Sequence, residues 1–184
     1  MFLLVGLGNI GGKYCFNRHN YGFLIIDKII NRYNLQPNNI KFKAEFYSGT
    51  ILNQKIIAIK PQTFMNLSGE AVLATMAFYK IPTQNIIVLH DDLDLQFGRF
   101  KYKIGGGNAG HNGLKSIDSK IGNQYFRLRL GIGRPLLASI SDFVLSDFSM
   151  QELDFIANTG DNIAKNISLL FDGKSDIFLQ QLNR

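Results

Sequence analysis

The chain has 184 residues, of which 46% are hydrophobic, and it carries a formal net charge of +6. No apolar run is long enough to span a bilayer, and the N-terminus lacks the basic and small-residue regions of a signal peptide. The single cysteine, Cys15, excludes an internal disulfide and suits a reducing compartment. We therefore expect one soluble, cytoplasmic domain that spans residues 1–184.

The positive charge is concentrated in one segment. Between Arg99 and Arg134 the only acid is Asp118, so this segment carries +7 and the rest of the chain carries −1. A generally basic surface would spread its lysines evenly, whereas this distribution predicts a basic face for a polyanion, in the first place nucleic acid. The basic residues of the segment are Arg99, Lys101, Lys103, Lys115, Lys120, Arg127, Arg129 and Arg134.

Short apolar runs alternate with helical periodicity along the chain. Strands are predicted at Phe2–Leu7, Phe42–Ile51, Lys55–Ile59, Ile86–Leu89, Arg99–Ile104 and Phe126–Ile132. Helices are predicted at Tyr21–Tyr33, Leu67–Tyr79, Asn112–Ile121 and Met150–Leu170, with a short C-terminal helix after Ser175. This order predicts a single-domain α/β fold with a twisted, mixed but mainly parallel sheet flanked by helices.

The first predicted strand ends in a glycine-rich loop. Its sequence, Gly6-Leu7-Gly8-Asn9-Ile10-Gly11, matches the G-x-G-x-x-G spacing of dinucleotide-binding folds. In those folds a helix begins at the third glycine and faces the pyrophosphate. Here the next helical pattern begins only after His19, and the nearest acid, Asp27, lies in the middle of that helix. We therefore expect a loop that presents His19 at a strand end. A nucleotide-dependent enzyme is the alternative, and saturable binding of NAD(P) would support it.

Polar side chains follow several of the predicted strands. They are Asn9, Tyr14, His19 and Asn20 after the first strand, the segment 60–66 after another, His90, Asp91, Asp92 and Asp94 after a third, and the segment 105–113 before a helix. The carboxyl ends of parallel strands meet at one edge of a sheet, where ligands bind. Histidine, aspartate and asparagine side chains at this edge predict an acid–base site.

Four segments carry a resemblance to a known family: GLGNIGGKYCFNRHNYGF, KPQTFMNLSGEAV, HDDLDLQFGRFKYKIGGGNAGHNGLKSI and FRLRLGIGRP. In this order and spacing they resemble bacterial peptidyl-tRNA hydrolase over nearly the whole chain. The resemblance implies an esterase that cleaves the bond between a peptide and the 3′ ribose of tRNA and so rescues tRNA from abandoned translation. It also implies a monomeric α/β protein whose partner is peptidyl-tRNA and which uses no metal or cofactor.

The resemblance also assigns roles to individual residues. His19 of NRHN matches the catalytic base, Asp91 of HDDLD matches the carboxylate that orients it, and Asn9 of GLGNIG matches the residue that distinguishes blocked from free aminoacyl groups. Positions that line the peptidyl-tRNA end match Tyr14, Phe64, Asn66 and Asn112, and the basic pair near the terminal phosphate of tRNA matches Lys103 and Arg129.

The chain departs from the family pattern at four loop positions. Ile10 stands where proline is usual, Asn17 stands where threonine is common, and Asn108 and Ala109 stand where histidine and glycine are commoner. None of these is a group assigned to the chemistry, so the departures bear on the rigidity of the loops.

Ester hydrolysis also follows from the residues themselves. A histidine can take a proton from water near neutral pH while a carboxylate such as Asp91 accepts its other N–H. Asparagine amides can donate to the developing oxyanion and pair with the peptide. Two alternatives stay open at this point: Cys15 or Ser68 as a nucleophile, and Mg²⁺ bound by Asp92 and Asp94.

The remaining polar motifs have more than one interpretation. We interpret His90 and His111 as supporting residues of the site. The glycines of the segment 105–107 could hold a phosphate through backbone N–H groups, move as a lid or form a simple turn. An RNA-binding relative that has lost catalysis is a further alternative, and the presence of both His19 and Asp91 argues against it.

Overall fold

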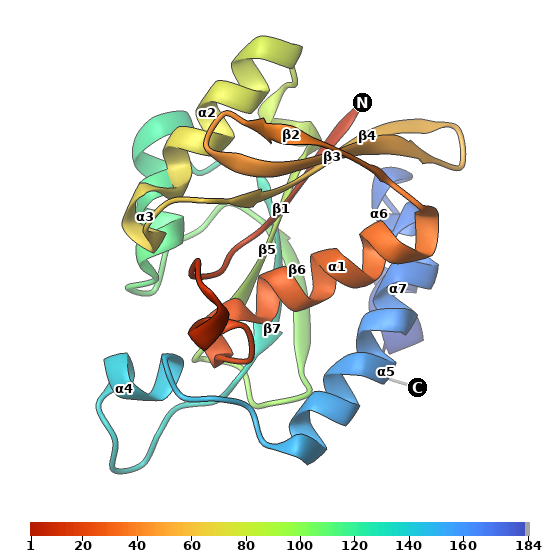
Figure 1. Ribbon diagram of the computed structural model, residues 1–184. Coiled ribbons are helices and arrows are strands. Elements are labelled where there is room, and N and C mark those ends of the chain that lie inside the picture. The colour runs from red at the N-terminus through yellow and green to blue at the C-terminus, as the bar shows by residue number, and fades with distance from the viewer. Residues whose placement is uncertain (183–184) are drawn as a thin grey trace.

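In the computed structural model, which describes residues 1–182, seven strands form one mixed sheet in the order β2-β3-β4-β1-β5-β7-β6 (Figure 1). The strands are β1 (Phe2–Gly6), β2 (Gln36–Lys41), β3 (Ala44–Ile51), β4 (Gln54–Pro61), β5 (Ile86–Asp92), β6 (Phe100–Ile104) and β7 (Phe126–Gly131). The four central strands, β4, β1, β5 and β7, run parallel to one another, and the others add antiparallel at the two edges. The predicted α/β fold is thereby confirmed.

Helices cover both faces of the sheet (Figure 1). One face packs against α1 (Tyr21–Tyr33), α5 (Met150–Asn166), α6 (Ser168–Phe171) and α7 (Ser175–Leu182), and the other packs against α2 (Ser68–Tyr79) and α3 (Asn112–Ile121). Each face has its own apolar core, because successive residues of β1 point to opposite sides: Leu4 belongs to the first core, whereas Leu3 and Val5 belong to the second. A central strand that is buried on both faces must be apolar throughout, as β1 is.

Several boundaries differ from the prediction. The edge strand β2 was not predicted, because all six of its residues are exposed and its sequence lacks an apolar pattern. The predicted helix Met150–Leu170 is divided into α5 and α6 at Ile167. A short helix, α4 (Ile140–Val144), lies in a segment with no prediction. The strand β5 continues past Leu89 to Asp92, so that His90, Asp91 and Asp92 form its end and Asp94 lies just beyond it.

The segment that carries His19 is short and tightly packed. Two short 3₁₀ helices, Gly12–Tyr14 and Arg18–Asn20, separate β1 from α1, which begins at Tyr21 as predicted. The helix approaches the ends of β1 and β5 closely at Gly22, where a Cβ atom would collide with the carbonyl oxygen of Leu89. Only one turn of 3₁₀ helix follows the third glycine of the loop, Gly11, and the first α-helix begins at Tyr21, so the loop lacks the α-helix that a dinucleotide-binding motif requires at that glycine. In the described part of the chain, no helix has both the length and the apolar character needed to cross a bilayer.

Candidate active site

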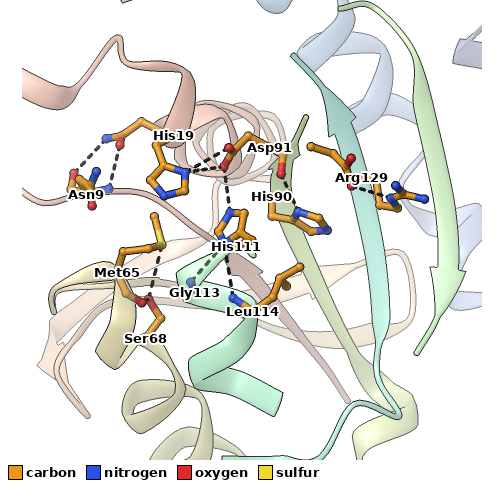
Figure 2. A network of polar contacts seen from close by, with 12 residues as sticks. Asn9, His19, Met65, Ser68, His90, Asp91, His111, Gly113, Leu114 and Arg129 are labelled. Carbon is orange, nitrogen blue, oxygen red and sulfur yellow. Dashed lines mark hydrogen bonds and ion pairs between the residues drawn. The ribbon is translucent and has the colours of Figure 1, made fainter. Parts of the chain in front are cut away.

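Two imidazole rings converge on one buried carboxylate at the end of β5 (Figure 2). The Nδ1 atom of His19 lies 2.9 Å from Oδ1 and 3.1 Å from Oδ2 of Asp91. The Nε2 atom of His111 lies 3.0 Å from the same Oδ1 atom. Asp91 is only 3% exposed, and His19 is 8% exposed. The carboxylate thus accepts hydrogen bonds from two rings that come from segments far apart in the chain.

The hydrogen bonds of His111 fix its tautomer. His111 is the N-cap of α3, and its Nδ1 atom accepts from the backbone N–H groups of Gly113 at 3.1 Å and of Leu114 at 3.4 Å. Its proton is therefore on Nε2, which donates to Asp91. His19 likewise directs Nδ1–H at this carboxylate, and its Nε2 atom has no partner within residues 1–182. The lone pair of this Nε2 is therefore free to accept a proton.

Burial and charge act in opposite directions on these groups. Burial alone would raise the pKa of Asp91, but the two neighbouring imidazoles outweigh it and hold that pKa well below its usual range. For His19, burial disfavours the charged ring, but the charge and hydrogen bond of Asp91 outweigh burial and raise its pKa above the usual value. Asp91 therefore stays ionised and stabilises His19 when the ring takes up a proton.

Asn9 is held by its backbone, which leaves its side chain free for a ligand. The Oδ1 atom of Asn20 accepts from the Asn9 N–H at 2.8 Å, and the Nδ2 atom of Asn20 donates to the Asn9 carbonyl oxygen at 2.9 Å (Figure 2). Asn20 is buried and follows His19 directly in the chain. The loop after β1 and the turn that carries His19 are therefore joined to each other.

The same turn is anchored on its other side by Arg18. Its guanidinium donates to both carboxylate oxygens of Glu152, at 2.8 and 2.9 Å, and lies 4.8 Å from the ring of Phe143 and 4.9 Å from that of Phe148. Glu152 belongs to the first turn of α5, where it also forms a capping box with Ser149. The position of His19 thus depends on contacts with the C-terminal third of the chain, which the motif NRHN alone does not reveal.

Three cavities adjoin these residues. The central one has a volume of about 410 Å³ and is lined by Asn9, His19, Asp91, His111 and Asn112, with an apolar wall of Ile140, Val144 and Leu145 at α4 and its end. A second cavity of about 260 Å³ is lined by His90, Asp92, Lys103, Arg127 and Arg129, among others. A third of about 210 Å³ is lined by Asn9, Ile10, Tyr14, Thr63, Phe64 and Leu145.

The cavities bring together most of the residues that the sequence analysis selected. The central cavity is lined by Asn9, His19, Asp91 and Asn112. The third cavity is lined by Tyr14 and Phe64 together with Asn9, and the second is lined by the basic pair, Lys103 and Arg129. Asn66 is exposed on the short 3₁₀ helix Met65–Leu67 and is absent from the lining of these three cavities, although its neighbour Met65 lines the central one. Sequence reasoning missed the α4 wall, since its residues carry no chemical signal.

Four basic side chains of β6 and β7 lie on one face of the sheet, but they differ in their contacts. Lys101 lies opposite Arg129 and Lys103 lies opposite Arg127 in the β6–β7 pair, so all four side chains point to one face. Arg127 is buried and binds Asp118 and the carbonyl oxygen of Gly107. Burial and the neighbouring arginines lower the pKa of Lys103. Arg127 is thus a structural residue, and it adds to the positive field around Lys103.

The carboxylates that could bind a metal are engaged by other groups. Asp92 accepts from Nε of Arg129 at 2.6 Å, and Asp94 accepts from Arg134 at 2.7 Å. The ligand atoms of His19, Asp91 and His111 lie within 4.8 Å of one another, which a metal ion could bridge. Because both imidazoles direct N–H groups at the carboxylate, the hydrogen bonds described above account for this arrangement without an ion.

Within residues 1–182, neither candidate nucleophile has a hydrogen bond to a basic side chain. Cys15 is exposed, and the hydroxyl of Ser68 is buried and donates to the carbonyl oxygen of Met65 at 2.9 Å.

One of the four departures from the family pattern, Ala109, lies in a strained backbone conformation. Ala109 has a φ of 48°, a left-handed conformation that glycine adopts without steric cost. The alanine therefore adds strain to the loop that borders the central cavity.

Comparisons with known proteins show which family this chain is similar to. The family model for peptidyl-tRNA hydrolase matches residues 3–184. The peptidyl-tRNA hydrolase of Rickettsia canadensis is 45% identical over 184 residues, which cover 99% of this chain and 100% of the relative. That of Bartonella henselae is 45% identical over 185 residues, which cover 100% of this chain and 96% of the relative.

A solved structure shows the same fold. The crystal structure of peptidyl-tRNA hydrolase from Acinetobacter baumannii superposes with a TM-score of 0.92 at 34% identity, covering 100% of this chain and 94% of that one. The match extends over the whole sheet and its helices. The family match, the full-length relatives and this structure together show that the chain belongs to the peptidyl-tRNA hydrolase family, a family of hydrolases.

Proposed function

We propose that this enzyme cleaves the ester between a peptide, or an N-blocked amino acid, and the 3′ ribose of tRNA by means of a water molecule that His19 activates. The observation that carries this proposal is the pairing of His19 Nδ1 with Asp91, which leaves Nε2 unpartnered among residues 1–182, on a ring that lines a cavity large enough for the end of a substrate. Family membership makes peptidyl-tRNA the substrate class.

In the proposed reaction, His19 Nε2 takes a proton from water as the water oxygen attacks the ester carbonyl carbon. The resulting imidazolium is stabilised by Asp91, and the amide N–H groups of Asn9 and Asn112 donate to the oxyanion. When the bond between the carbonyl carbon and the 3′ oxygen breaks, His19 returns its proton to that oxygen. The products are a free peptide and deacylated tRNA, and the residues used are all present at the central cavity.

The other residues contribute to substrate selection. Asn9 can pair with the amide of a blocked substrate, and we assign to it the discrimination against a free α-ammonium group, which no carboxylate of its loop would neutralise. Tyr14, Phe64 and Asn66 contact the peptidyl end in this proposal. Lys103 and Arg129 bind a phosphate of the tRNA.

The proposal includes the setting in which the enzyme works. Peptidyl-tRNA is a cytoplasmic product of interrupted translation, so we place the enzyme there. We expect it to act as a monomer and without a metal or cofactor, because a histidine, a carboxylate and amide donors suffice for the steps above.

The test compares N-acetyl-aminoacyl-tRNA with free aminoacyl-tRNA and measures the release of deacylated tRNA. Wild type should cleave the blocked substrate preferentially, and Asn9→Asp should narrow that preference because an added carboxylate accommodates the ammonium. Absence of cleavage with retained tRNA binding would overturn the proposal in favour of an RNA-binding protein. An equal preference in wild type and Asn9→Asp would remove only the role of Asn9.

A further inference from the structure

His90 is a buried polar residue that the proposed reaction leaves unused. Its ring is 2% exposed, and its Nδ1 atom lies 2.8 Å from the backbone carbonyl oxygen of Asp91. A carbonyl oxygen only accepts, so Nδ1 carries the proton and Nε2 carries a lone pair. This Nε2 atom has no hydrogen-bond partner within residues 1–182.

The charge state of the ring is fixed by its surroundings. Burial, together with the neighbouring His111, lowers the pKa of His90 to about 3, against smaller opposing effects of Asp91 and Asp92. The ring is therefore neutral at any pH at which translation proceeds. Its Nε2 atom is thus a permanent hydrogen-bond acceptor, and a buried acceptor without a donor is unfavourable.

His90 lies between the central cavity and the second cavity. Its ring lines both the central cavity, where His19 faces the ester, and the second cavity, which contains Lys103 and Arg129. In Figure 2 the ring lies between His111 and Arg129, and β-sheet register places His90 directly beside Arg129. His90 lines both cavities together with Asp92, Asn108 and Ala109, so it belongs to the wall that joins the catalytic ring to the basic pair.

The chemistry of Nε2 restricts what it can bind. A phosphodiester has no proton to donate at neutral pH, so it cannot pair with this acceptor. A sugar hydroxyl is a donor, and in the proposed substrate the terminal ribose lies between the ester and the nearest phosphate. That ribose has one free hydroxyl, at the 2′ carbon beside the esterified 3′ oxygen.

We propose that binding of the terminal ribose displaces the groups that cover Nε2 of His90, and that this atom then accepts a hydrogen bond from the 2′-hydroxyl, which makes His90 a residue that distinguishes an RNA 3′ end from a DNA 3′ end. This inference rests on the proposed function and deepens it. Loss of the donor leaves a buried acceptor unpaired, so removal of the hydroxyl should lower kcat/KM by about tenfold through His90 alone.

The test uses N-acetyl-aminoacyl-tRNA that ends in adenosine or in 2′-deoxyadenosine, with wild type and His90→Asn. The asparagine amide can still donate to the Asp91 carbonyl oxygen, but it lacks an acceptor at the Nε2 position. The hydroxyl also affects the intrinsic reactivity of the ester, and this effect is common to both enzymes and cancels. The ribo-to-deoxy ratio of kcat/KM should therefore fall by about tenfold in His90→Asn. His90→Gln, which retains an acceptor near Nε2, should preserve part of the ratio.

An unchanged ratio in His90→Asn, or equal cleavage of both substrates by wild type, would overturn the inference and leave an ordered water as the partner of Nε2. Absence of cleavage of either substrate by wild type would instead reject the proposed function. These two failures are therefore distinguishable.

A measurement on wild type alone avoids any folding defect of the variants. The probe is a 3′-amide analogue of N-acetyl-aminoacyl-adenosine 5′-phosphate, with and without its 2′-hydroxyl, observed through the ¹⁵N signals of the His90 ring. The Nε2 signal should shift only with the hydroxylated analogue. An equal shift with both analogues would assign Nε2 to the base, and no shift with either would exclude a ligand contact; both results would overturn the inference.

Discussion

Arg18 and Glu152, which are 134 residues apart, form a two-pronged ion pair that ties the turn of His19 to the first turn of α5. Both side chains are largely buried, and Arg18 is held between two aromatic rings. A backbone hydrogen bond from Arg18 to Ser146 runs parallel to this contact. The segment that contains α4 also lines the central cavity, so the backbone bond to Ser146 joins the turn of the proposed base to that wall.

We predict that Glu152→Gln lowers kcat more than tRNA affinity. The amide can accept from only one side of the guanidinium, so Arg18 loses its charge partner and the His19 turn loses rigidity. Stability should fall by about 1–3 kcal/mol in urea unfolding, in line with the loss of a partly buried charged partner. Asp161→Asn is the matched control, since Asp161 lies on α5 like Glu152 but forms an exposed ion pair with Lys28 of α1, the loss of which should have little effect. Equal effects of the two variants would contradict a positioning role.

His19→Ala should lower the rate of cleavage of N-acetyl-aminoacyl-tRNA by about 10²–10⁴ while tRNA binding persists. Asp91→Asn should cost a similar factor or less, because the imidazole is retained but loses the acceptor that orients it. Cys15→Ser should leave the rate nearly unchanged. Full turnover by His19→Ala, or a peptidyl group trapped on Cys15 or Ser68, would refute activation of water.

The rate should rise with pH along one limb that belongs to His19. The neutral ring is the active base, so the rate increases as pH passes upward through its pKa, which Asp91 raises above the usual value of 6.5. In Asp91→Asn the carboxylate charge is gone and burial remains, so the limb should move to lower pH. The linkage has the matching sign: the protonated ring stabilises the fold fully below pH 6.5, and this contribution is lost as pH rises through the folded pKa. A limb that stays in place in Asp91→Asn would rule out this coupling.

Lys103→Ala should weaken tRNA binding and reduce the slope of log affinity against log salt by about one, as expected for one lost phosphate contact. Cleavage of a short ester without tRNA should barely change. Lys55→Ala is the control, because this exposed lysine lies at the start of β4, remote from the carboxyl ends of the strands. Arg129→Ala is a poorer test, since it also leaves the buried carboxylate of Asp92 without its partner. Equal salt slopes for wild type and Lys103→Ala would reduce Lys103 to an ordinary surface charge.

The central strands and the main helices were predictable because their apolar periodicity is local. The strand β2 was not, because Gln36–Lys41 is exposed throughout and lacks an apolar pattern, and its pairing with β3 includes a hydrogen bond from Asn38 to Ser48 that only the folded chain brings together. The end of α5 was also missed, since apolar residues continue across Ile167 into α6 without a proline or glycine to mark the break. Exposed edges and helix junctions depend on the assembled fold more than on neighbouring residues.

The residues of the candidate site also divide into those that local sequence predicts and those that depend on the assembled fold. His19, Asp91 and Asn9 were selected from loop motifs at strand ends, and the structure brings all three to one cavity. The hydrogen bond of His111 to Asp91 and the pairing of Arg18 with Glu152 depend on contacts between distant segments, for which a single sequence carries no signal.

The two outer strands of the sheet have a consequence for association between chains. An open edge presents unpaired backbone groups that a second chain could extend, which is a common route to aggregation. On β2, Pro37 has no N–H to offer, Lys41 adds charge, and the pairing with β3 shifts register before Lys41. The opposite edge is β6, which carries Lys101 and Lys103. The lysines that we assign to a polyanion thus also oppose edge-to-edge pairing of this sheet with that of a second chain, so that removing both would favour self-association as well as weaken RNA binding.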